Sequence, residues 1–244
     1  MNKLVFVFCF FGLASGACNA AGRNECPELA TKSAFVENMD YYVDLTASRP
    51  NCASPYGMLA LTALYSARPF VQLYMPGAPR DCPSREKLEN INNNLRIAVE
   101  FADDALRIER DYFHPWLVKL LSVSPFHDNQ YGMPSCAQWF MGNGDNFIRV
   151  LKSGMSSLSS PDDKLSLIKE ALELTLIQGY FRSDNGIFQR RANGIVPAFL
   201  SPSQEADLKK FALKELSGLA SSPLNKDFDR QFVKNALSYL KSVR

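Results

Sequence analysis

The sequence predicts an all-α protein, a compact, disulfide-stapled bundle of about seven or eight helices. Apolar residues recur at helical spacing along most of the chain, and no stretch alternates as a β-strand would. Ser-Pro dipeptides precede most of the periodic stretches. Ser is a favoured N-cap and Pro is tolerated in the first helical turn, so these dipeptides predict helix starts. They are Ser54-Pro55, Ser124-Pro125, Ser160-Pro161, Ser201-Pro202 and Ser222-Pro223.

The N-terminus has the pattern of a secretory signal peptide. Lys3 is followed by the apolar run "LVFVFCFFGLA" and then by small residues. This run is shorter than the roughly 18 apolar residues that a membrane-spanning helix needs. We therefore expect residues 1–20 to be a signal peptide and residues 21–244 to form a single all-helical domain. The protein would be exported, to the periplasm or as a secreted protein, and both bacterial and eukaryotic hosts fit such a leader.

Cys18 has two alternative fates. The stretch "SGAC" resembles a bacterial lipobox, in which the cysteine is acylated, but Ser15 stands where that motif prefers Leu. Cleavage near Ala20 would instead remove Cys18 with the leader. We favour cleavage, with an N-terminal lipid anchor, and hence an outer-membrane lipoprotein, as the alternative. Either fate leaves an even number of thiols: Cys26, Cys52, Cys82 and Cys136.

Four cysteines in an exported chain favour two disulfides, with buried thiols as the alternative. They include no C-x-x-C pair, so we expect no metal site. Helical periodicity predicts a first helix from Pro27 to about Ala47, with Met39, Tyr42 and Val43 facing inward.

The length of this helix bears on the pairing of the cysteines. A helix of about 20 residues spans about 30 Å and would hold Cys26 away from Cys52. A second helical segment, from Pro55 to about Met75, would bring Cys82 back to Cys26 if it ran antiparallel. The predicted pairs are therefore Cys26–Cys82 and Cys52–Cys136. If Pro69 turns the chain, Cys52–Cys82 is the alternative.

The longest helix is predicted from about Ser84 to Phe113. One arc of this helix is charged, and it comprises Arg96, Glu100, Asp103, Arg107 and Asp111. The opposite arc is apolar, and it comprises Leu88, Ile91, Leu95, Ala98, Ala102, Ala105 and Tyr112.

Glu109 interrupts this apolar arc. A buried carboxylate needs a cationic partner or a raised pKa. Glu109 and His114 are thus the candidate catalytic pair if the protein is an enzyme. A structural ion pair, or a helix that ends earlier, is the interpretation that we favour.

Two later helices differ in their predicted burial. The stretch "LIKEALELTLIQGYF" (167–181) is apolar around more than half of its circumference, so we expect it to be buried on several sides. The last helix carries a single apolar stripe, formed by Phe228, Phe232, Ala236, Tyr239, Leu240 and Val243.

Two irregular stretches are candidate binding surfaces. Residues 122–146 are long for a connection and combine turn-forming residues with aromatic ones. The candidate anchors in this stretch are Phe126, His127, Tyr131, Trp139 and Phe140. If these side chains are exposed, they would bind a partner; if they turn inward, they would form a small core of the loop itself. In residues 181–200, Arg190 and Arg191 could bind a carboxylate, with a solvated face as the alternative.

Composition and motifs favour a binding protein over an enzyme. The formal net charge of +2 and the absence of a Lys/Arg run argue against a nucleic-acid partner. No G-x-S-x-G nucleophile motif, calcium loop or cofactor motif is present. We predict an exported helical module that binds another protein, such as an inhibitor or immunity-type factor in the periplasm or on the outer membrane. The alternatives are a hydrolase with a Glu109–histidine site and a carrier of a small apolar ligand.

Overall fold

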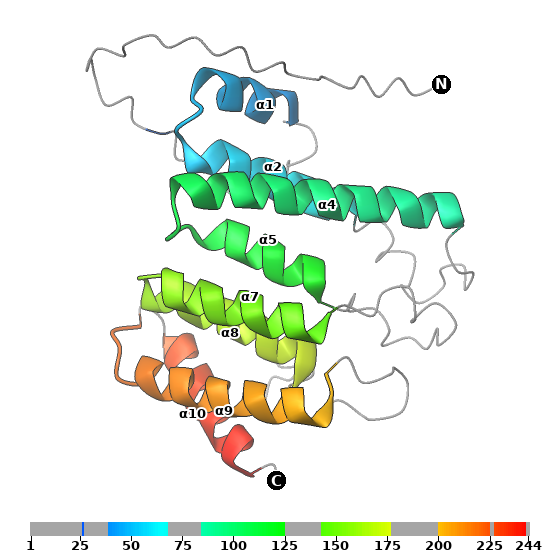
Figure 1. Ribbon diagram of the computed structural model, residues 1–244. Coiled ribbons are helices and arrows are strands. Elements are labelled where there is room, and N and C mark those ends of the chain that lie inside the picture. Colours follow the sequence, from blue (N-terminus) through cyan, green and yellow to red (C-terminus); the bar gives the residue numbers. More distant parts are fainter. Residues whose placement is uncertain are drawn as a thin grey trace.

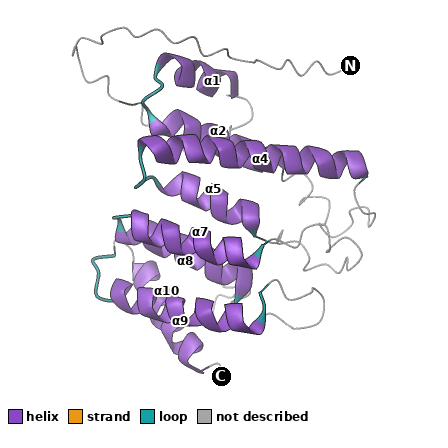
Figure 2. Cartoon of the chain, viewed as in Figure 1, coloured by secondary structure: helices purple, strands orange, loops and turns teal. Residues whose placement is uncertain are grey.

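The computed structural model describes residue 26 and residues 39–67, 84–124, 143–176, 200–224 and 227–242, and this part of the chain is helical without strands (Figure 2). The predicted all-α class is confirmed, and the described residues contain eight helices. The helices are α1 (Met39–Ser48), α2 (Ala53–Ala67), α4 (Arg85–Ile108), α5 (Phe113–Val123), α7 (Gly144–Ser157), α8 (Pro161–Thr175), α9 (Pro202–Leu219) and α10 (Asp227–Ser242).

The helices stack in the order of the chain (Figure 1), and most contacts join helices that are close in sequence. The described residues form two apolar cores. One lies among α1, α2, α4 and α5, and the other extends from Leu106 at the end of α4 and from α5 through α7 and α8 to α9 and α10. Helix α5 joins them, because Val118 belongs to the first core whereas Trp116 and Leu120 belong to the second. Among the helices that the structure describes, none combines the length and apolar character that crossing a membrane requires.

Helix α4 has the predicted charged and apolar arcs. Ala98, Ala102 and Ala105 are fully buried, and their small side chains let α2 and α4 pack closely. The opposite arc is exposed, and Arg96 donates a hydrogen bond to Glu100 over 2.6 Å. The helix ends at Ile108, five residues before the predicted end at Phe113.

Two of the five Ser-Pro dipeptides start helices as predicted. Ser160 caps α8, and its side chain accepts a hydrogen bond from the backbone N–H of Asp163. Ser201 caps α9 in a full capping box with Gln204.

The other three dipeptides depart from this pattern or are described only in part. Ser54 and Pro55 lie in the first turn of α2, which begins at Ala53, because a helix tolerates Pro there. Ser124 is the C-cap of α5, and the residues after it, where the predicted helix would start, lie outside the described residues. Ser222 lies in the turn before α10, which begins only at Asp227.

The first helix was predicted from Pro27, and residues 27–38 of that range lie outside the described residues. Helix α1 has 10 residues and begins at Met39. Tyr42 is buried against the first core as expected, but Met39 and Val43 are exposed, because α1 lies at the end of the stack and α2 is the main helix packed against it. Their predicted inward orientation is wrong.

The structure joins Cys26 to Cys52 in a disulfide, with the Cα atoms 5.5 Å apart. The predicted Cys26–Cys82 and Cys52–Cys136 pairs are therefore wrong. The prediction assumed one straight helix of about 30 Å after Cys26, whereas α1, at 10 residues, spans only about 15 Å. Cys82 and Cys136 lie outside the described residues.

The later helices confirm one burial pattern and correct the other. Helix α8 is buried on several sides, through Leu165, Leu167, Ile168, Ala171, Leu172 and Leu174. Helix α10 buries Phe232, Ala236 and Leu240, but Phe228 is 52% exposed. Phe228 lies in the first turn, at the edge of the core, and the ammonium group of Lys169 lies 4.8 Å from its ring centroid.

Candidate functional site

The two residues proposed as a catalytic pair differ in exposure, since Glu109 is exposed after the end of α4 and His114 is half-buried in α5. Because α4 ends at Ile108, Glu109 leaves the helical phase and is exposed. The expectation that it interrupts a buried apolar face is wrong, and the interpretation that the helix ends earlier is confirmed. His114 lies in the first turn of α5, where its ring packs edge-on against those of Tyr112 and Phe113, each with centroids 5.4 Å apart.

His114 is partly buried beside the start of α8. Burial lowers the pKa of the imidazole, and the Asp163 carboxylate opposes this shift. Its Nδ1 atom is buried and has no hydrogen-bond partner among the described residues. Burial raises the pKa of Asp163, and a hydrogen bond from Ser160 opposes that shift. This environment favours a neutral histidine in a packing role.

The turn before α5 is tied to the turn before α8 through Asp111. Its carboxylate accepts hydrogen bonds from the backbone N–H of Ser159, over 2.6 Å, and from the Ser159 hydroxyl. These bonds lower the pKa of Asp111. A Ser-His-Asp relay needs an imidazole between hydroxyl and carboxylate, and here the two meet directly. The arrangement is that of a structural tie between two turns.

Tyr112 lies between His114 and the backbone of α2. Burial raises its pKa to about 12, with Glu109 adding to the shift. A Cβ at Gly57 would lie 2.5 Å from Cε1 of Tyr112, so the ring packs directly on the α2 backbone. A phenol held neutral in this way is a packing residue rather than a base.

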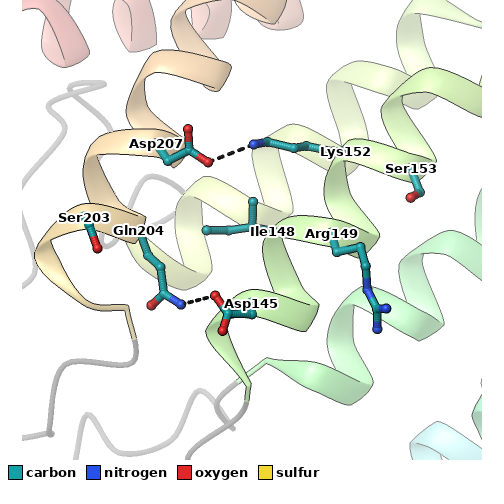
Figure 3. A pocket seen from close by; sticks show the side chains of 8 residues that line it. All are labelled: Asp145, Ile148, Arg149, Lys152, Ser153, Ser203, Gln204 and Asp207. Atoms are coloured by element: carbon teal, nitrogen blue, oxygen red, sulfur yellow. Dashed lines mark hydrogen bonds and ion pairs between the residues drawn. The ribbon is translucent and has the colours of Figure 1, made fainter.

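A groove of about 550 Å³ lies between α7 and the start of α9 (Figure 3). Two side-chain pairs cross it. The Gln204 amide donates a hydrogen bond to Asp145 over 2.6 Å, and Lys152 forms an ion pair with Asp207 over 2.8 Å. The hydrogen bond and charge of Lys152 lower the pKa of Asp207. Arg149 points away from α9 and donates to Asn146.

The pairs across this groove engage Asp145, Lys152 and Asp207, whereas Arg149 has no charged partner among the described residues. Both carboxylates already accept a bond from the opposite helix, and Gln204 also completes the capping box of α9. Among the described residues, no group of three or more His, Cys, Asp or Glu side chains could hold a metal ion. The two side-chain pairs that cross the α7–α9 groove therefore hold α7 and α9 together.

A second groove, of about 520 Å³, lies between the end of α9 and one face of α10. Apolar side chains form its floor, with Leu224 and Val233 buried and Leu237 half-buried. Its rim is cationic, because Arg230, Lys234 and Lys241 all line it and all are exposed. We call this the α9–α10 groove.

The cations of the α9–α10 groove are only partly neutralised. Arg230 donates a hydrogen bond to the Leu224 carbonyl over 2.6 Å and pairs with Asp227. Within the described ranges, Lys234 and Lys241 form neither an ion pair nor a hydrogen bond. An anion is the chemical class that such a rim can bind.

Sequence reasoning missed these cations because it followed only the apolar stripe of α10. A signal was present in the sequence, since residues 230–242 contain Arg230, Lys234 and Lys241 but no Asp or Glu. The predicted binding residues lie outside the described residues, and these are Phe126, His127, Tyr131, Trp139, Phe140, Arg190 and Arg191. Cys18 lies outside them as well.

No model of a known protein family matches this chain, and comparisons with curated proteins and with solved structures found no significant match.

Proposed function

We propose that this chain is an exported helical protein-binding module whose partner binds in the α9–α10 groove. One observation carries the proposal. Lys234 and Lys241 stand exposed on the rim of a groove with an apolar floor, and neither is neutralised by another described residue. An apolar centre with a polar, charged rim is the usual composition of a protein–protein interface.

The arrangement of the helices supports the proposal. Helices that stack in chain order present continuous surfaces, which proteins of this architecture use to bind partners. Helices α9 and α10 lie at one end of the stack (Figure 1), and the groove is lined by α10 and by residues of the turn before it.

The region around His114 offers less support for the hydrolase alternative. A hydrolase needs an activated nucleophile within reach of a general base. Here the Ser159 hydroxyl is bound to Asp111, the imidazole pKa is lowered by burial, and Glu109 is exposed after the end of α4.

Export is part of the proposal and rests on the leader sequence. We expect the mature chain to lack residues 1–20 or to carry an acyl group on Cys18. Intact-mass measurement of the chain purified from the exporting cell tests this. A mature chain that begins at an unmodified Cys18 would contradict it.

Site-specific photocrosslinking tests the binding surface. A photoreactive residue would replace Ser238, which is exposed in the groove, and in a matched control would replace Ser217, which is exposed on α9 outside both grooves. We expect Ser238→photoresidue to crosslink a discrete protein in the producing cell and the control not to do so. The absence of any crosslinked protein, or equal yields at both positions, would overturn the proposal.

A further inference from the structure

We propose that the occupant of the α9–α10 groove is an acidic amphipathic helix whose carboxylates are spaced two turns apart. This inference rests on the proposed protein-binding function and names the chemistry of the partner. It is carried by the spacing of the cations, by the absence of Asp and Glu from residues 230–242 of α10, and by the apolar floor of the groove.

The cations of α10 define a spacing. Lys234 and Lys241 are seven residues apart on one helix, which places them about 10.5 Å apart along its axis and about 20° apart around it. Arg230 lies one turn before Lys234. A second helix laid along α10 has the same rise, so its residues i and i+7 match the two lysines. The partner's Asp or Glu residues are therefore expected at i and i+7.

The charges that would satisfy these cations must come from outside α10. Its acidic residues, Asp227 and Asp229, lie in the first turn, and Asp227 already pairs with Arg230. Arg230 also binds the Leu224 carbonyl, so it holds the floor of the groove in place. A guanidinium has five donors, and two described contacts leave others for a carboxylate.

The floor favours a peptide over a membrane surface. The groove is concave, with a volume of about 520 Å³ above Leu224, Val233 and Leu237, so it can receive a protruding side chain. Docking on anionic lipid usually uses clusters of about four to eight Lys or Arg side chains. Among the described residues, the α9–α10 groove has three cations, one of which is already engaged. We expect the partner helix to place an apolar residue between its two acids.

The test uses a synthetic helical peptide with Glu at positions i and i+7 and Leu at i+3 and i+4. A second peptide carries Gln in place of both Glu residues. Binding of each labelled peptide to the mature protein is measured by fluorescence anisotropy at low and high salt. We expect the Glu peptide to bind at least ten-fold more tightly than the Gln peptide, with an advantage that shrinks as salt rises, because salt screens exposed charges.

Paired variants locate the site. Lys234→Gln with Lys241→Gln removes two positive charges from the groove. The control, Lys210→Gln with Lys214→Gln, removes the same charge from exposed positions of α9 outside both grooves. Circular dichroism should show all variants folded. We expect the groove variant to lose at least ten-fold in affinity for the Glu peptide and the control variant to retain it.

Three results would overturn the inference: equal binding of both peptides, equal losses in both variants, or binding to vesicles rich in phosphatidylserine without binding to the Glu peptide. The last result would identify a lipid surface as the occupant. If Ser238→photoresidue crosslinks a protein while the Glu peptide does not bind, the protein-binding function stands and only the partner chemistry is wrong.

Discussion

The grooves at the two ends of α9 have similar volumes, about 550 and 520 Å³, but use their charged side chains differently. At the start of α9, Asp145 and Asp207 each bind a side chain of the facing helix. At the end of α9, Lys234 and Lys241 have no anion beside them in the part of the chain that the structure describes.

This difference separates two uses of a surface charge. A charged side chain that reaches a partner on another helix helps to set how the two helices lie. A charged side chain that faces solvent above an apolar floor adds nothing comparable to the fold and keeps its capacity to bind another molecule. Mutations in the α7–α9 groove are therefore expected to change the stability of the protein, and mutations in the α9–α10 groove are expected to change the binding of a partner.

The largest expected effect concerns α10, the helix that carries Lys234 and Lys241. Phe232 is fully buried under α10, so Phe232→Ala should lower the free energy of unfolding by about 3 kcal/mol, through lost apolar burial and a cavity. Phe228→Ala is the matched control, because Phe228 is 52% exposed on the same helix and should cost less than about 1 kcal/mol. Chemical denaturation measures both. Equal losses would show that α10 is not anchored as described.

A smaller loss is expected in the α7–α9 groove. Gln204→Ala removes the capping-box bond to the Ser201 N–H and the bond to Asp145, and should cost about 1 kcal/mol of stability. Gln231→Ala removes only a bond to Asn235 on the exposed face of α10, and should cost close to nothing. Urea denaturation of the two variants measures their free energies of unfolding and so tests whether the Gln204 bonds hold α7 and α9 together. A neutral Gln204→Ala would contradict that role.

An effect of similar size is expected from the half-buried carboxyl group of Glu173. Burial raises the pKa of Glu173 to about 7, Glu170 adds to the shift and Lys169 opposes it, and Oε1 is buried without a hydrogen-bond partner among the described residues. Because the folded state holds this proton more tightly than the unfolded state, stability falls as pH rises from about 4.5 to about 7. Glu173→Gln should remove that decline.

The expected gain from Glu173→Gln at pH 8 is about 1 kcal/mol, after allowance for the part of the side chain that water still reaches. At pH 4 the variant and the natural protein should be equally stable, which provides the internal control. Thermal denaturation across this pH range measures the effect. An equal gain at both pH values would show that charge is not the cause.

Short-range features of the fold could be predicted from the sequence. The caps at Ser160 and Ser201, the burial of the 167–175 stretch and the exposed charged arc of α4 all depend on residues within four positions of one another. Local spacing is therefore enough to predict them. The α9–α10 cations belong to this class as well, since their spacing is visible in the sequence.

Features that depend on how helices end and meet could not be predicted in this way. Helix α4 stops at Ile108, and the turn that follows it is held by bonds from other elements. Trp116 of α5 donates to the Arg110 carbonyl over 2.9 Å, and the backbone N–H of Ser159, far along the chain, donates to Asp111. These contacts expose Glu109, although local periodicity continues past it.

The sequence by itself determined the helical class, the phase of the helical faces and the two Ser-Pro caps, because helical periodicity and capping act within one or two turns. Only the tertiary structure decided the Cys26–Cys52 pair, the end of α4 and the difference between the two grooves. Each of these joins residues from separate elements, so it is set by the packing of whole helices and by long-range hydrogen bonds that no local pattern encodes.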